Sequence, residues 1–146
     1  MRKSLSLFIT AVMAFMVAGI VEHTDAQEPT VGSVDTAGTA HGVYVDDSYA
    51  YVADGDSGLQ VIDVTNPESP VIVGSVGMQY SGRARGVHVS GSYAYVVNDL
   101  GDFQNPVFSL EVIDISNPES PVSVGYFGTQ GSPRDLHVSE IGRAHV

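Results

Sequence analysis

Basic and imidazole side chains recur at two fixed places in this sequence of 146 residues. His41, Arg85 and Arg134 share one place in a repeated pattern, and His88 and His137 share another, three residues further on. Arginine binds carboxylates and phosphates through paired hydrogen bonds, and neutral imidazoles can coordinate zinc or copper. These five residues are the first candidates for a binding site, provided that the fold brings them together.

Two plainer interpretations apply to the same residues. The chain has 17 Asp and Glu against 6 Lys and Arg, so each arginine can pair with a nearby acid and serve only solubility. Tyr44 stands where the later units have His88 and His137, which leaves too few imidazoles to predict a metal site. The residues alone favour the ion-pair interpretation and predict no metal ligand.

Repeated carboxylates offer a second kind of candidate chemistry. Asp63 and Asp114 share a register among apolar neighbours, where we expect them to accept hydrogen bonds from nearby backbone N–H groups. Asp54 and Asp56 alternate with glycine as in a calcium loop, but Thr65 stands where such a loop needs an acidic ligand at its twelfth position. A tight hairpin turn is the preferred interpretation, and calcium at Asp54 and Asp56 stays open as the alternative; no other cofactor is expected.

The overall composition limits the partners. A formal net charge of −11 would repel nucleic-acid phosphate and an anionic membrane surface, so neither is an expected partner. The candidate partners are a protein or a small anionic ligand, the latter attracted by the local positive charge of the arginines. The chain has no Cys, which excludes disulfides and zinc–cysteine sites. No motif of a nucleophilic hydrolase, phosphate-binding loop, zinc protease or dinucleotide-binding site occurs. We therefore predict no catalytic residue.

Residues 1–26 have the organisation of a secretory signal peptide. A positively charged start precedes an apolar stretch from Leu5 to Val21, and small residues at Thr24 and Ala26 form a cleavage site. The sequence thus predicts a secreted or cell-surface protein with no membrane span after cleavage. The alternative is an uncleaved anchor, because the apolar stretch is near the short end of a span of about 20 residues.

The rest of the chain repeats itself. GVYVDDSYAYVAD at 42–54 returns as GVHVSGSYAYVVN at 86–98, and LQVIDVTNPESP at 59–70 returns as LEVIDISNPESP at 110–121. The offsets from Gly42 to Gly86 and from Leu59 to Leu110 are 44 and 51 residues. A shorter element, VGSV at 31–34, returns at 73–76 and, as VGYF, at 124–127.

Each unit contains four short runs rich in Tyr and Val, separated by Gly, Asp, Asn or Pro. We expect these runs to be strands, at 42–45, 49–53, 59–64 and 71–76 in the first unit, with no helix after residue 26. Asn-Pro-Glu-Ser-Pro predicts a turn in which the Asn side chain bonds the backbone ahead. Both faces of the runs are largely apolar, so the four-stranded units must be covered on both sides, as propeller blades of about 40 to 50 residues are.

The stretches GLQVIDVTNPESPVIVGSV and SLEVIDISNPESPVSVGYF resemble the LVIVD-repeat family, a class of secreted bacterial and archaeal β-propellers. The resemblance spans about residues 31–139 and implies an all-β fold of four-stranded antiparallel blades around a channel. It implies an incomplete propeller of about two blades plus flanking strands within a repeat domain at 27–139. The blades fall at about 42–76 and 86–127, a third begins near 134, and residues 140–146, which abandon the pattern, are interpreted as a non-native tail or truncation.

In the family's arrangement the first strand of each blade lines the channel. The resemblance therefore implies that His41, Arg85, His88, Arg134 and His137 cluster at the channel mouth. The implied function is binding or scaffolding at the cell surface or outside the cell. The alternatives are a propeller-fold hydrolase or lyase that uses the channel mouth, and a purely architectural repeat of a larger surface protein.

The second unit has a longer loop, Asp99–Ser109, where the first has only GDSG. The resemblance implies that this loop lies on the same side of the blade as the entry to the next first strand. Leu100, Phe103 and Phe108 are apolar, and we expect them to contact a neighbouring blade or a ligand. The alternative is that they cover their own blade.

Overall fold

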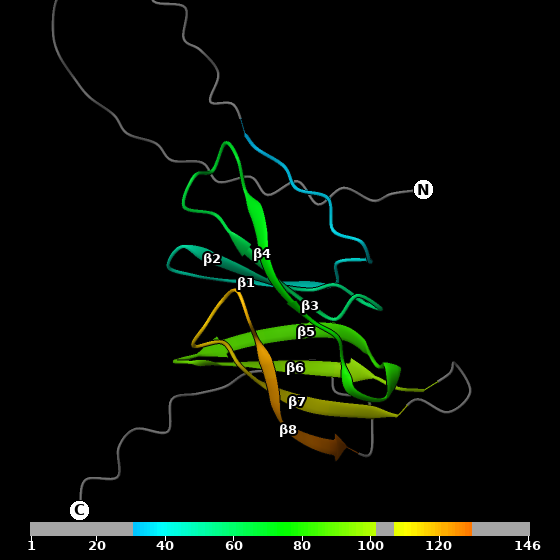
Figure 1. The fold of residues 1–146 in the computed structure, drawn as a ribbon. Coiled ribbons are helices and arrows are strands. Elements are labelled where there is room, and N and C mark those ends of the chain that lie inside the picture. The colour runs from blue at the N-terminus through cyan, green and yellow to red at the C-terminus, as the bar shows by residue number, and fades with distance from the viewer. Residues whose placement is uncertain (1–30, 102–106, 130–146) are drawn as a thin grey trace, which may run out of the picture.

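The computed structural model describes residues 31–101 and 107–129, which form two four-stranded antiparallel sheets stacked one on the other (Figure 1). The first sheet contains, in spatial order, β1 (Gly42–Asp46), β2 (Tyr49–Ala53), β3 (Leu59–Asp63) and β4 (Val71–Val76). The second sheet contains β5 (Arg83–Ser90), β6 (Tyr93–Asp99), β7 (Phe108–Asp114) and β8 (Val122–Thr129). Within each sheet every strand pairs with the next strand along the chain, so each sheet is one repeat unit. The predicted all-β architecture of four-stranded antiparallel blades is confirmed.

Two details of the connection into the second sheet differ from the sequence expectation, besides shifts of one residue at the ends of β1 and β3. β5 begins at Arg83, three residues before the predicted start, because Arg83 and Ala84 pair with the end of β6. A single 3₁₀ turn, η1 (Gln79–Ser81), precedes β5 where no helix was expected, and a hydrogen bond of 3.1 Å from the Gly82 N–H to the Gln79 carbonyl closes it. A turn of three residues is too short to show the apolar periodicity by which a helix is predicted from sequence. The predicted signal peptide at 1–26, third blade and tail at 140–146 lie outside the described residues.

The Asn-Pro-Glu-Ser-Pro segments form the predicted turns. Asn66 Oδ1 accepts the backbone N–H of Glu68 at 3.1 Å, and Asn117 Oδ1 accepts that of Glu119 at 3.2 Å. Each Asn carbonyl also accepts the N–H of the Ser three residues later, at 3.0 Å in both turns. The third and fourth strands are therefore joined in the same way in both sheets.

The two sheets pack face to face over one apolar core. Strand alternation gives each sheet a front face and a rear face, and the front face of the first sheet meets the rear face of the second. The first sheet contributes core side chains that are at most 4% exposed: Tyr51, Ala53, Leu59 and Val61. The second sheet contributes side chains that are at most 5% exposed: Ala94, Val96, Ile113 and Ile115. The stacking buries both apolar faces that meet at the junction, as expected for neighbouring blades.

The rear face of the first sheet has a different cover. Ala50, Val52 and Ile62 are buried there against Val34 and Ala40, which belong to the segment before β1. A small apolar hollow of about 30 Å³ lies on the same face. This segment is a single extended stretch, so it covers the rear face less completely than a whole sheet covers the front face.

A glycine lets the turn of each sheet pack closely against the strand or segment that lies on it. A β carbon at Gly74 in β4 would lie well inside 3.0 Å of the Pro118 carbonyl oxygen, in the turn of the second sheet. Gly32 stands in the same way against the carbonyl of Glu68 in the turn of the first sheet, and its N–H donates to the Pro67 carbonyl at 3.0 Å. Residues 31–34 thus take the place on the first sheet that β4 takes on the second.

Candidate binding site at the junction of the sheets

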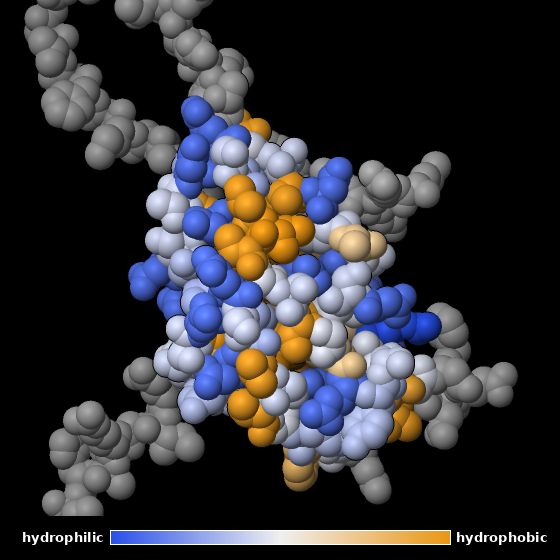
Figure 2. All heavy atoms as spheres, viewed as in Figure 1, coloured by the Kyte–Doolittle hydropathy of each residue, from blue (hydrophilic) through white to orange (hydrophobic). Residues whose placement is uncertain are grey.

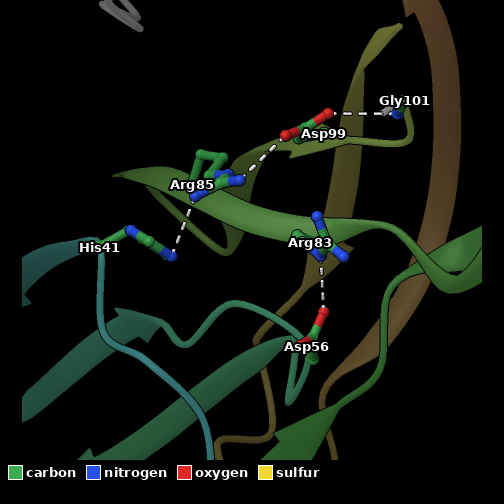
Figure 3. A network of polar contacts seen from close by, with 6 residues as sticks. All are labelled: His41, Asp56, Arg83, Arg85, Asp99 and Gly101. Atoms are coloured by element: carbon green, nitrogen blue, oxygen red, sulfur yellow. Dashed lines mark hydrogen bonds and ion pairs between the residues drawn. The ribbon is translucent and has the colours of Figure 1, made fainter. Parts of the chain in front are cut away.

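Arg85 joins the two sheets at the end where β1 and β5 begin (Figure 3). Its Nη2 donates to Asp99 Oδ2 at 2.9 Å, and its Nη1 lies 3.2 Å from Nε2 of His41. A guanidinium has only N–H donors, so the imidazole nitrogen is the acceptor of this contact. His41 immediately precedes β1, whereas Asp99 ends β6. One arginine is therefore held by side chains from both sheets.

Arg83 makes a second contact between the sheets at the same end. Its Nε donates to Asp56 Oδ1 at 3.0 Å, and the two side chains are 49% and 81% exposed (Figure 3). Beside this pair, the backbones of Gly55 and Ala84 exchange two hydrogen bonds of 3.1 and 2.9 Å. An exposed ion pair stabilises a fold by only about 0–1 kcal/mol, so the backbone bridge is the firmer connection.

The junction collects the positive charge of the described chain. Arg83 and Arg85 are the only Lys or Arg residues within 31–101 and 107–129, and each has an acidic partner, as the composition led us to expect. The Arg85 side chain is 37% exposed and its partner Asp99 only 16%. Arg85 therefore combines a fixed position with access from solvent.

His88 contacts the first sheet three residues further along β5. Its ring lies edge-to-face with that of Tyr44 of β1, with centroids 4.8 Å apart and planes at 63°. The structure thus brings His41 to Arg85 and Tyr44 to His88, on neighbouring strands. Arg134 and His137, the other two predicted residues, lie outside the part of the chain that the structure describes.

Asp54 and Asp56 serve different partners. Asp54 is fully buried; its Oδ1 accepts the Thr36 hydroxyl at 2.7 Å and its Oδ2 accepts the Gly38 N–H at 2.8 Å. Asp56 lies at the surface and pairs with Arg83. Asp54 therefore fastens the segment before β1 to the first sheet, and this geometry adds no support for the calcium alternative.

A buried polar cluster on the rear face of the second sheet was missed by the sequence analysis. Asn98, Ser109 and Glu111 are at most 1% exposed. Glu111 Oε2 accepts from Asn98 Nδ2 at 2.8 Å and from the Gln79 N–H at 3.1 Å. Asn98 Oδ1, Ser109 Oγ and Glu111 Oε1 have no hydrogen-bond partner among the described residues. Glu111 fastens the connection between the sheets through one carboxylate oxygen.

The repeat contained a signal for this cluster. Alignment of the two units pairs Asp54 with Asn98 and Gln60 with Glu111, so the carboxylate changes strand between the units. In both sheets one buried carboxylate accepts a backbone N–H from the segment that leads into the first strand. The two units therefore make equivalent contacts with carboxylates at different positions, and the exchange of acid and amide between the aligned positions was the sequence signal for this.

Asp63 and Asp114 form the backbone hydrogen bonds predicted for them. Asp63 Oδ1 accepts the Thr65 N–H at 2.8 Å, and Asp114 Oδ1 accepts the Ser116 N–H at 2.9 Å. Hydrogen bonds from the side chain and then the backbone of Thr65 lower the pKa of Asp63 below its ordinary 3.8. Those from the backbone and then the side chain of Ser116 lower the pKa of Asp114 in the same way. Both carboxylates therefore stabilise the start of a turn.

The long loop of the second sheet is described only at its ends. The Leu100 N–H donates to the Val107 carbonyl at 2.7 Å, and Leu100 packs so closely over Gly82 that a β carbon there would lie 2.9 Å from its Cδ2. The predicted bounds of the loop, Asp99–Ser109, are too wide, because Asp99 pairs with Phe108 and so extends β6, while Phe108 and Ser109 begin β7. Phe108 is half-buried there. Leu100 thus contacts the connection into β5, while Phe103 lies outside the described residues.

The described segments contain neither a metal-binding cluster nor a membrane-spanning helix. Within residues 31–101 and 107–129, no three His, Cys, Asp or Glu side chains gather closely enough to hold a metal ion. In the same part of the chain, no helix is long and apolar enough to cross a membrane.

The fold and the junction define a class of protein: a repeat module of stacked, four-stranded antiparallel blades. A family model described as the LVIVD repeat matches residues 37–77 and 81–129, one sheet each. These matches cover more than half of the chain, which belongs to the LVIVD-repeat family. Neither the curated proteins nor the solved structures contain a match to this chain.

Proposed function

We propose that this LVIVD-repeat chain is an exported binding module, and that its ligand, a protein or a small molecule, presents a carboxylate or another small anionic group to Arg85. The observation that carries the proposal is the arrangement of that arginine. It is held by His41 of one sheet and Asp99 of the other while more than a third of its side chain stays exposed.

The chemistry of the guanidinium supports this assignment. It has five N–H donors in a planar fork that matches a carboxylate, and the contacts to His41 and Asp99 involve one donor atom each, Nη1 and Nη2. Its position is fixed from both sides, so a ligand has less side-chain entropy to remove. Asp99 competes for the same charge, and we therefore expect weak, salt-sensitive binding.

The sequence also supports the export and surface-binding parts of this proposal. The organisation of residues 1–26 supports passage across a membrane, and the family resemblance supports a place outside the cell. In a chain with a net charge of −11, the junction with its two described arginines is the place where an anion meets the least repulsion, although each arginine also has an acidic partner. Function at the cell surface or in the medium is part of the same proposal.

The test is a titration of ¹⁵N-labelled protein with citrate, followed by NMR at low and high salt. We expect saturable shifts at the backbone amides of His41, Gly86 and Gly101, and their loss in Arg85→Gln. Arg83→Gln is the matched control, because Arg83 lies at the same junction but bonds to the exposed Asp56. Shifts that persist in Arg85→Gln, or that vanish equally in both variants, would refute the proposal.

An architectural role is the second candidate function, because both arginines already connect the sheets. In that case Arg85→Gln lowers the free energy of unfolding and citrate produces no saturable shift in the parent protein. The two functions therefore give opposite results in the same titration.

A further inference from the structure

Three buried polar side chains lie together on the rear face of the second sheet. Hydrophilic side chains cover much of the visible surface in Figure 2, but Asn98, Ser109 and Glu111 are at most 1% exposed. Asn98 and Ser109 are register partners on β6 and β7, and Glu111 lies two residues further along β7, on the same face. We call these three residues the Glu111 cluster. A buried polar atom is unfavourable unless something bonds to it.

Each residue of the Glu111 cluster has one buried oxygen atom without a hydrogen-bond partner among the described residues: Asn98 Oδ1, Ser109 Oγ and Glu111 Oε1. The amide orientation of Asn98 is fixed, because its Nδ2 donates to Glu111 Oε2 at 2.8 Å. The Gln79 N–H donates to that same carboxylate oxygen at 3.1 Å. Both donors therefore bond to Oε2, and three oxygen atoms on neighbouring side chains are left to bind a ligand.

The charge of Glu111 is also uncompensated in the described part of the chain. Arg83 and Arg85 are the only Lys or Arg residues there, and they pair with Asp56 and Asp99. A carboxylate buried without a positive charge beside it is costly, because the protein interior solvates the charge poorly. A water molecule could bond to these oxygens but would not balance the charge, whereas a cation would coordinate the oxygens and balance the charge.

The first sheet shows that the repeat does not require these three oxygens. The equivalents of the Glu111 cluster in that sheet, in the same order, are Asp54, Gly58 and Gln60. Asp54 uses both carboxylate oxygens, one for the Thr36 hydroxyl and one for the Gly38 N–H, and Gly58 has no side chain. Ser109 therefore adds a hydroxyl that the first sheet lacks, next to a carboxylate that keeps one oxygen unbonded.

The ligand atoms and their charge select the kind of ion. Carboxylate, amide and hydroxyl oxygens are hard ligands, unlike the His and Cys clusters that hold softer metals. A single carboxylate balances one positive charge, so a divalent ion would leave excess charge in the interior. Calcium sites gather several carboxylates, and magnesium keeps waters of its own, which does not suit a cluster closed to solvent. A small monovalent cation fits best.

We propose that the Glu111 cluster binds one sodium ion through Asn98 Oδ1, Ser109 Oγ and Glu111 Oε1. The ion neutralises the carboxylate, whose other oxygen keeps its hydrogen bonds to Asn98 and to the Gln79 N–H. Gln79 begins η1 in the connection between the sheets, so the ion also stabilises that connection. This site is separate from the anion site proposed at Arg85.

The test is urea unfolding of the full chain in sodium chloride and in choline chloride at equal ionic strength. Choline is too large to enter a site closed by three side chains, so the two salts separate sodium binding from screening. A ligand that binds only the folded state raises the folding equilibrium constant in proportion to its concentration once the site is nearly saturated. We expect this constant to rise almost tenfold for each tenfold increase in sodium, and to stay unchanged in choline.

Three variants assign the effect to the cluster. Glu111→Gln removes the charge that the ion neutralises and should abolish the difference between the two salts. Ser109→Ala removes one ligand, so a higher sodium concentration should be needed for the same stabilisation. Glu119→Gln is the matched control, because it removes the same charge from an exposed position in the turn after β7, and it should respond to sodium like the parent chain.

The line width of the ²³Na NMR signal gives a second measurement, which does not depend on unfolding. The folded parent chain and Glu119→Gln should broaden the sodium resonance, and Ser109→Ala should broaden it less. Equal stability of the parent chain in the two salts would overturn the proposal, as would an undiminished sodium effect in Glu111→Gln. Stronger stabilisation by calcium chloride than by sodium chloride would overturn the assignment of a monovalent ion.

Discussion

Replacing Gly74 by alanine tests the packing of one sheet on the turn of the next. The added β carbon would lie well inside 3.0 Å of the Pro118 carbonyl oxygen and 3.0 Å from Cδ of Pro121. Both neighbours belong to a turn held by its own hydrogen bonds, so β4 must move by on the order of 1 Å or the sheets must separate slightly. Overpacking of this kind costs about 1–3 kcal/mol.

Part of that cost is offset, because alanine is favoured over glycine within a strand by about 0.5–1 kcal/mol. We therefore expect Gly74→Ala to lower the free energy of unfolding by about 1–2 kcal/mol. Gly125→Ala is the matched control: its β carbon fits against Val112 at 3.4 Å, so its stability should equal or exceed that of the parent.

The assay is urea unfolding followed by circular dichroism and tyrosine fluorescence, since the chain has 7 Tyr and no Trp. It is done at a concentration at which the chain is monomeric, so that any self-association does not contribute. Equal unfolding midpoints for Gly74→Ala and Gly125→Ala would show that the turn of the second sheet does not rest on β4.

Two further predictions concern buried and turn-forming carboxylates. Asn98→Asp puts a second acid beside the fully buried Glu111 and should lower the free energy of unfolding by at least about 3 kcal/mol in the same urea assay. Combining Asn98→Asp with Glu111→Gln reproduces the Asp54 and Gln60 pair of the first sheet, so the double variant should recover most of the lost stability. The folded-state pKa values of Asp63 and Asp114 are lowered, so their stabilisation is complete above about pH 4 and is lost as the pH falls through those lowered values. Asp63→Asn should therefore flatten the acid limb of the unfolding midpoint against pH, and an unchanged acid limb would refute that assignment.

The repeat explains why so much of the fold could be predicted. Two copies of each apolar run identified the strands of each sheet, and the Asn-Pro-Glu-Ser-Pro turns indicated where the chain reverses, while the four-stranded antiparallel arrangement came from the family resemblance. The start of β5 was not predictable in this way. Arg83 extends the strand because it pairs with Asp99 and because Ala84 bonds Gly55 of the other sheet. Such contacts depend on how the sheets stack, which the local pattern does not contain.

The candidate site was predicted in part for the same reason. The shared repeat position of His41 and Arg85, together with the family resemblance, predicted that they lie at the same end of neighbouring first strands, and the two side chains are in contact there. The roles of Asp99 and Asp56 as partners of the arginines, and the buried Glu111, depend on distances between strands far apart in sequence. The role of Glu111 depends on its burial, and the residues next to it in the sequence do not distinguish a buried acid from an exposed one.

Amide hydrogen exchange at Gly55 and Ala84 tests the central claim most directly. The site and the proposed function require the two sheets to be docked, and these two N–H groups donate hydrogen bonds across the junction, at 3.1 and 2.9 Å. Docked sheets predict that both amides exchange slowly and together, with protection approaching that of Val52 and Val96 in the strands. Free exchange at Gly55 and Ala84, with protection kept inside each sheet, would contradict the account.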